Sequence, residues 1–154
     1  MKKERKESGF TLIEVLIVIG IIALLAGVVL VSINPTRQFK LARDSQRTSH
    51  VIAIVNAIGQ NISEHRGIFQ CGNNTMTIPA TTTIMKSSSG FDIAPCLVPV
   101  YLATMPFDPI ATSSHYTSVI DYDSGYSIFL DVNDRVTIFA PKTEIQNPII
   151  SITR

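Results

Sequence analysis

The strongest pattern in the chain is an apolar run from Phe10 to Ile33 that contains one charged residue, Glu14. At ~1.5 Å per residue, a helix over this run is about 36 Å long and can cross a hydrocarbon core of ~30 Å. A secretory signal has a shorter apolar stretch of about 7–15 residues, followed by a small-x-small cleavage site. Ala23 and Ala26 lack that spacing, and the run continues past them. The run therefore predicts a membrane-spanning helix that is not removed as a signal peptide.

The pattern changes at Asn34 and Pro35, because proline cannot donate a backbone hydrogen bond and displaces the preceding helical turn. Residues 34–66 then show apolar positions at helical spacing and predict a second, amphipathic helix. Lys40 and Asp44 are four positions apart and form a candidate ion pair on it. We expect the apolar stripe of this helix to pack on a sheet. The stripe consists of Val51, Val55, Ile58 and Ile62.

Residues 67–154 show loop and strand patterns. Segment 72–90 is rich in Thr, Ser and Asn and predicts an exposed connection. Strands are expected at 115–122, 126–132 and 135–140, with turns at 123–125 and 132–134. The tail from Ile145 to Arg154 is expected to be either an added strand or disordered. The expected class is α+β, with a long helix packed on a small antiparallel meander.

Charge and side-chain chemistry exclude several function classes. The net charge is +1, and residues 1–9 hold four of the thirteen basic and two of the twelve acidic residues, which leaves nine basic and ten acidic residues in the rest of the chain. That balance does not favour binding to nucleic acid. The histidines His50, His65 and His115 are scattered, and no G-x-S-x-G motif occurs. We therefore expect a protein that is not an enzyme.

The N-terminal segment KESGFTLIEVLIVIGIIALLAGVVL resembles that of type IV prepilins and pseudopilins. The shared pattern is a short basic leader, here residues 1–9, ending in Gly9, then Phe10, then a long apolar helix with Glu14 as its fifth residue. The resemblance implies cleavage after Gly9 by a membrane aspartyl peptidase and N-methylation of Phe10. It also implies that the C-terminal part is exported. The charge pattern alone does not decide the orientation of the span, because basic residues lie on both sides of it.

The resemblance implies a pilin-like organisation and a structural role. The expected parts are a leader 1–9, a spanning or filament-core helix 10–33, an amphipathic helix 34–66 and a β-rich domain 67–154. The implied function is that of a type IV pilus or pseudopilus subunit, held in the membrane and then assembled into an extracellular or periplasmic filament. Its implied partners are copies of itself, the peptidase and methylase, and an inner-membrane platform with its assembly ATPase. The alternative is an extracytoplasmic binding or enzymatic domain tethered by an uncleaved helix.

Glu14 has two interpretations. In a filament it would lie among apolar helices, where an unpaired carboxylate costs several kcal/mol and needs a partner. The resemblance supplies one, the α-amino group of Phe10 on an adjoining subunit. The alternative places Glu14 among lipid headgroups or in a favourable position near the positive end of the helix dipole. We prefer the first interpretation.

The basic residues after the span also have two interpretations. Arg37, Lys40, Arg43 and Arg47 are spaced by three, three and four positions, so the last three share a helix face. A solvated face or headgroup contact just outside the membrane is the simpler interpretation. The other is contact with acidic residues of neighbouring subunits, or with DNA, although the lack of interleaved aromatic residues argues against DNA.

The segment from Leu97 to Glu144, which begins LVPVYLATMPFDP, also resembles pilin and pseudopilin domains, and the tail from Ile145 lies outside this resemblance. The shared elements are a Leu-Pro approach, an Asp-Pro turn at Asp108 and Pro109, and Tyr-rich strands. A Trp-Gly after the Asp-Pro, typical of major pseudopilins, is missing, which leaves the subclass open.

Two further features leave alternatives open. Cys71 and Cys96 form either a disulfide, as expected in an exported domain, or two separate buried thiols. Some pseudopilins bind calcium in loops, and five oxygen-bearing residues here either converge as Ca²⁺ ligands or serve as ordinary turn residues. No other cofactor is expected. The five residues are Asp121, Asp123, Asp131, Asn133 and Asp134.

Overall fold

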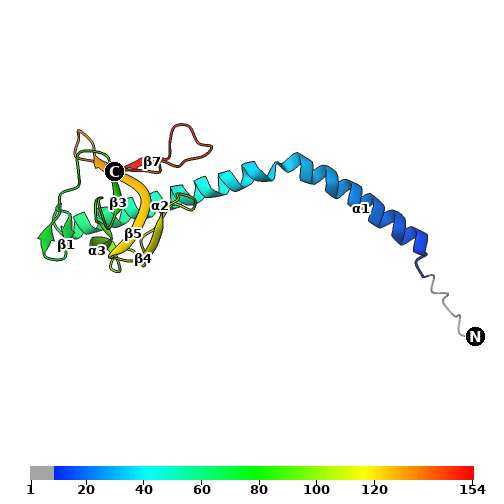
Figure 1. Ribbon diagram of the computed structural model, residues 1–154, viewed down its shortest axis with the longest axis horizontal. Coiled ribbons are helices and arrows are strands. Elements are labelled where there is room, and N and C mark those ends of the chain that lie inside the picture. Colours follow the sequence, from blue (N-terminus) through cyan, green and yellow to red (C-terminus); the bar gives the residue numbers. More distant parts are fainter. Residues whose placement is uncertain (1–8) are drawn as a thin grey trace, which may run out of the picture. The chain divides into compact units, whose positions relative to one another are not determined.

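The computed structural model describes residues 9–154 and divides the chain into two units, one ending at Phe39 and one beginning at Lys40. In the first unit, the apolar run forms helix α1, Leu12–Ile33 (Figure 1). The predicted spanning helix is thereby confirmed as a helix of sufficient length and mean hydropathy. Helix α2, Pro35–Glu64, follows after one residue and continues into the second unit.

Helix α1 ends where the sequence predicts a break. Asn34 adopts the left-handed conformation, with φ +47°, and Pro35 is the first residue of α2. Proline suits that position because its missing N–H would have no partner within the helix. The Asn34 side chain accepts a hydrogen bond from the Arg37 N–H at 3.3 Å. The two residues therefore end one helix and start the next.

The second unit contains an antiparallel sheet (Figure 1). Strand β5 is central: β3 pairs along one edge, while β4 and β6 pair with different parts of β5, and β7 pairs with β6. A separate two-stranded hairpin, β1–β2, follows α2, and a short helix, α3, precedes the sheet's middle strands. The bounds are β1 Gln70–Cys71, β2 Asn74–Thr75, β3 Thr83–Lys86, α3 Ala94–Leu97, β4 His115–Ser118, β5 Asp121–Leu130, β6 Val136–Phe139 and β7 Ser151–Thr153.

The core lies between α2 and the sheet. Val51, Val55 and Ile58 of the predicted stripe are buried, and Ile62 packs against them while partly exposed. Alternate residues of β5 and β6 supply the other side, with Tyr126 and Ile138 fully buried. These helical and alternating spacings are what a helix and a strand need to bury one face each. The α+β, pilin-like arrangement is confirmed.

The predicted turn at 123–125 is wrong, because these residues lie inside β5. Gly125 has a φ of +69°, and its N–H donates to the Asp123 carboxylate at 2.9 Å, so the segment makes a local irregularity without reversing the chain. The buried Ser124 hydroxyl donates to the Met85 carbonyl at 2.7 Å and ties β5 to β3 there. The chain instead reverses just before β5, beside the exposed Ile120.

The prediction of one exposed connection over 72–90 is also wrong in part. This stretch contains β2 and β3, and its apolar residues Ile78 and Met85 are buried in the core. The apolar residues form two short groups, Met76 with Ile78 and Ile84 with Met85, which are too few to give a sustained alternation. For the tail, the structure supports the first alternative, an added strand, since β7 pairs with β6.

Cys71 and Cys96 are joined in a disulfide that links hairpin β1–β2 to α3. We expect replacement of both cysteines by serine to lower the free energy of unfolding by ~3–4 kcal/mol, because the bond closes a loop of 25 positions in the unfolded chain. Urea unfolding of the full chain in detergent measures this. The reduced wild-type chain is the control and should match the variant. Equal stability of the oxidised chain and the variant would contradict the expectation.

Candidate functional site

The predicted cleavage bond, Gly9–Phe10, lies in non-helical backbone before α1. Both residues are exposed, with Phe10 84% accessible. A Cβ added at Gly9 would meet no atom within 4 Å, so nothing in the described structure obstructs this bond. Residues 1–8 of the predicted leader lie outside the described residues.

Helix α1 begins with a reciprocal cap between Thr11 and Glu14. The Glu14 N–H donates to the Thr11 hydroxyl at 3.3 Å, while the Thr11 N–H and hydroxyl each lie 3.4 Å from Glu14 Oε2. Such a capping box satisfies backbone N–H groups that the first turn of a helix leaves without partners. Thr11 is a residue that the sequence prediction missed, although Thr-x-x-Glu before an apolar run is the signature of this cap.

The cap bears on both interpretations of Glu14. It realises the local one, because the carboxylate stabilises the positive end of its own helix. Both hydrogen bonds that the carboxylate accepts within residues 9–154 use Oε2. The cap therefore uses one of the two carboxylate oxygens and, within these residues, leaves Oε1 without a hydrogen bond.

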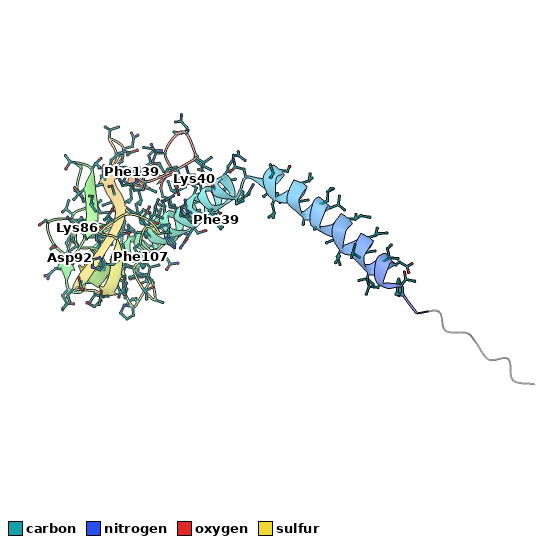
Figure 2. All side chains as sticks on the ribbon, turned by 45° about the vertical axis from the view of Figure 1, so that its right-hand side comes forward. Phe39, Lys40, Lys86, Asp92, Phe107 and Phe139 are labelled. Carbon is teal, nitrogen blue, oxygen red and sulfur yellow. A yellow bond between two sulfur atoms is a disulfide. The ribbon has the colours of Figure 1, made fainter. Side chains whose placement is uncertain are left out.

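The rest of α1 is an uncovered apolar surface. None of its residues is buried, and Glu14 is its only charged residue. Side chains project from all around the helix in Figure 2. Leu12, Leu24 and Leu30 are 84%, 68% and 66% exposed. A helix that is apolar on every side needs lipid or other helices around it.

A second feature, buried in the C-terminal unit, is a cluster of charges that we call the Arg47 cluster. It consists of Arg43, Asp44, Arg47, Asp108 and Glu144. Arg47 is at its centre with a side chain that is 0% exposed. Its guanidinium donates to both Asp108 oxygens at 2.8 and 3.2 Å, to Asp44 at 2.8 Å and to Glu144 at 3.1 Å. Arg43 donates to the same Glu144 carboxylate at 2.6 and 2.8 Å.

The cluster corrects the prediction of a solvated basic face for Arg43 and Arg47, whereas Arg37 is exposed as that prediction expects. Arg47 is buried, Arg43 is only 29% exposed, and their acidic partners belong to the same chain. The predicted pair of Lys40 with Asp44 is also replaced, because Asp44 binds Arg47 and the backbone N–H groups of residues 144–146. The acidic partners Asp108 and Glu144 lie 61 and 97 positions from Arg47 in the sequence, where helical spacing gives no signal.

In the Arg47 cluster, hydrogen bonds shift the pKa values more strongly than burial does. Burial alone would raise the pKa of Asp44 and of Asp108, yet both pKa values are lowered, by backbone N–H donors and by Arg47. For Arg47, burial acts to lower the pKa, but bonds to Asp108, Glu144 and Asp44 raise it overall. All members are therefore charged at neutral pH. Asp108 also accepts hydrogen bonds from the Ile110 and Ala111 N–H groups of its own loop.

Glu144 gives the cluster a defined pH dependence. Hydrogen bonds with Arg43 and with Arg47, together with the charges of both arginines, lower its pKa from 4.5 to about 2 despite its partial burial. A carboxylate with a lowered pKa stabilises the fold fully above its unfolded value, and that stabilisation is lost as the pH falls towards its folded value. We expect the free energy of unfolding to fall between pH 4.5 and about 2, and Glu144→Gln to flatten this part of the profile. Urea unfolding at a series of pH values tests this, and an unchanged acid limb in the variant would contradict it.

The five candidate calcium ligands do not converge. Two lie at the start of β5 and three at the turn beyond its end, separated by a strand of ten residues, or ~30 Å. Asp121 is 3.1 Å from His115, and Asp131 is 2.6 Å from Arg135. Within residues 9–154, no group of three or more His, Cys, Asp or Glu side chains is placed to hold a metal ion. The two groups are Asp121 with Asp123, and Asp131 with Asn133 and Asp134.

Comparison with known proteins bears on the N-terminal segment. Residues 5–30 match the family described as the prokaryotic N-terminal methylation motif, a range that includes Gly9, Phe10 and Glu14. No curated protein and no solved structure matches the chain. The motif points to a structural protein, and together with α1 it is consistent with membrane insertion. The chain thus carries the prokaryotic N-terminal methylation motif, the signature of type IV prepilins.

Proposed function

We propose that this protein is a structural subunit of a type IV pilus or pseudopilus. It is inserted in the membrane as a precursor, cleaved after Gly9, methylated at Phe10 and polymerised into a helical filament. The observation that carries this proposal is the methylation motif on a helix with no buried residue. Such a helix needs an apolar environment in both the stored and the assembled state.

Cleavage after Gly9 is supported by the exposed, non-helical backbone on both sides of the bond. Glycine leaves the peptide bond unobstructed by a side chain. The basic residues Lys2, Lys3, Arg5 and Lys6 would hold the bond at the cytoplasmic face. Cleavage creates an α-amino group on Phe10, and addition of one methyl group to an amine keeps its positive charge.

That new amine is the cation that Glu14 requires in the filament. In the bilayer, the carboxylate is close to the helix start and within reach of headgroups and water. Among packed apolar helices it would be costly without a partner. The ammonium of Phe10 on an adjoining subunit neutralises it and fixes the axial register of the two helices.

Assembly exchanges lipid around α1 for neighbouring helices. Because one apolar environment replaces another, the helix is never exposed to water, and the exchange can be driven in either direction by an inner-membrane platform with its ATPase. The proposed partners are thus other copies of the chain, the peptidase and methylase, and this assembly machinery. After assembly the C-terminal unit would lie outside the cytoplasm.

The test is the intact mass of the protein purified from its own host. We expect a mature chain that begins at Phe10 and carries one methyl group on its amine. A chain that begins at Met1 would overturn the proposal and favour the alternative, an extracytoplasmic domain tethered by an uncleaved helix. Gly9→Leu should accumulate as the uncleaved precursor, and Gly20→Leu, an equal change within α1, should still be cleaved.

A further inference from the structure

The structure separates two Asn-x-Ser/Thr sequences that look equivalent in the chain, Asn61-Ile62-Ser63 and Asn73-Asn74-Thr75. This pattern is the acceptor for N-linked sugars in exported proteins, and it functions only at an accessible surface. We propose that Asn73 is an N-glycosylation site of this protein and that Asn61 is not. The proposal rests on export of the C-terminal unit, which is part of the proposed function.

Asn61 is unable to act as an acceptor in the folded chain. It is 2% exposed, and both ends of its amide are engaged: the nitrogen donates to the Gln70 carbonyl and the oxygen accepts from the Gln70 N–H, each at 2.9 Å. Ser63 donates to the Gly59 carbonyl at 2.8 Å. Residues two apart on an α-helix point to different sides, so the Ser63 hydroxyl faces away from Asn61.

Asn73 has the opposite environment. It lies at the tip of hairpin β1–β2, where Gly72 and Asn73 form the two-residue turn between the paired residues Cys71 and Asn74. Asn73 and Thr75 are both exposed. The positive φ of Gly72, +60°, suits the first position of such a turn.

The acceptor sequence spans only the tip of the hairpin. Asn73 lies in the turn and Thr75 in β2, so both of its functional groups belong to this exposed tip. The disulfide between Cys71 and Cys96 fixes the base of the hairpin to α3. The tip is therefore presented at a defined place on the surface, outside the five-stranded sheet and its core.

The reaction joins the Asn73 amide nitrogen to the anomeric carbon of an oligosaccharide carried on a polyprenyl diphosphate. A C–N bond forms as the C–O bond to the diphosphate breaks. The polyprenyl diphosphate leaves with the bonding electron pair, and the amide nitrogen loses one proton to a base of the transferase. No oxidant or reductant is needed, and the amide keeps one N–H.

The experiment compares intact masses and peptide maps of full-length variants expressed in the protein's own host. In the wild type we expect a mass excess of at least one sugar residue on the peptide that contains Asn73. Asn73→Gln and Thr75→Ala should each lose this excess completely. The matched controls are Asn74→Gln, which changes the adjacent asparagine but keeps the acceptor sequence, and Ser63→Ala, which removes the buried one. Both should keep the full excess.

A wild-type chain without added sugar at Asn73 would overturn the inference, as would an excess that persists in Asn73→Gln. The same mass spectra distinguish failure of the proposed function from failure of the inference about Asn73. A chain that still begins at Met1 shows that the filament proposal has failed, whereas a chain that begins at methylated Phe10 and bears no sugar rejects only the inference about Asn73.

Discussion

Replacement of Glu14 by glutamine is expected to abolish filaments while the subunit remains in the membrane. Glutamine at this position can still form the reciprocal cap with Thr11, so the start of α1 is preserved. It carries no charge and, in the proposed filament, would leave the Phe10 ammonium of the adjoining subunit uncompensated among apolar helices. Loss of an ion pair from such an environment costs ~3–5 kcal/mol per contact, which is repeated along a filament. Electron microscopy of sheared filaments and immunoblots of membrane fractions measure the two parts of this result.

The converse variant separates the cap from the charge. Thr11→Val removes the hydroxyl that caps the Glu14 N–H but leaves the carboxylate in place. It costs about 1 kcal/mol at one helix end, and we expect filaments to persist. Filaments in Glu14→Gln together with their loss in Thr11→Val would show that Glu14 acts only through the helix start. In that case the pairing with a neighbouring subunit would have to be abandoned.

The sequence predicts those parts of the fold that rest on local repetition. An apolar run of the right length, a proline after it and a stripe at helical spacing predict α1, the break at Pro35 and the buried face of α2. Alternation likewise predicts the inner faces of β5 and β6. Each of these signals comes from residues close in the chain, since an element buries one face through its own periodicity. The motif at Gly9 to Glu14 is local in the same sense.

The features that the sequence does not predict arise from contacts between residues that are far apart in the chain. Asp123 and Gly125 resemble a turn, but pairing of β5 with β3 on one edge and β4 on the other keeps the strand continuous through them. Met85 follows Ile84 in an otherwise polar segment, and it is buried because that segment pairs with β5. Basic residues at helical spacing do not reveal that acidic residues from distant loops will cover Arg47.

The Arg47 cluster explains why α2, the loop at Asp108 and the β6–β7 connection remain together. The Asp44 carboxylate accepts three backbone N–H groups from residues 144–146, and Asp108 accepts those of Ile110 and Ala111. Arg47 joins the two carboxylates. The cluster therefore gives α2 attachments to two distant loops that do not depend on apolar packing.

Arg47→Met is therefore expected to destabilise the C-terminal unit by ~3–5 kcal/mol, the cost of leaving buried carboxylates without their cation. Methionine preserves much of the side-chain volume, so the loss reports charge more than a cavity. The backbone N–H donors to Asp44 and Asp108 remain and limit the loss. Urea unfolding of the full chain in detergent measures it. The near-ultraviolet signal of the buried Tyr122 and Tyr126 is a suitable probe because the chain has no tryptophan.

Two comparisons test whether the loss of stability in Arg47→Met arises from uncompensated charge. Arg43→Met removes a partly exposed arginine from the same cluster while Arg47 still neutralises Glu144, so it should cost no more than about 1 kcal/mol. Adding Asp108→Asn to Arg47→Met removes one of the uncompensated carboxylates, so the double variant should be less destabilised than the sum of the two single changes. Equal losses in Arg43→Met and Arg47→Met, with additive effects in the double variant, would mean that the cluster contributes only packing. A coupled loss would identify Arg47 as the group that keeps three distant segments of the chain together.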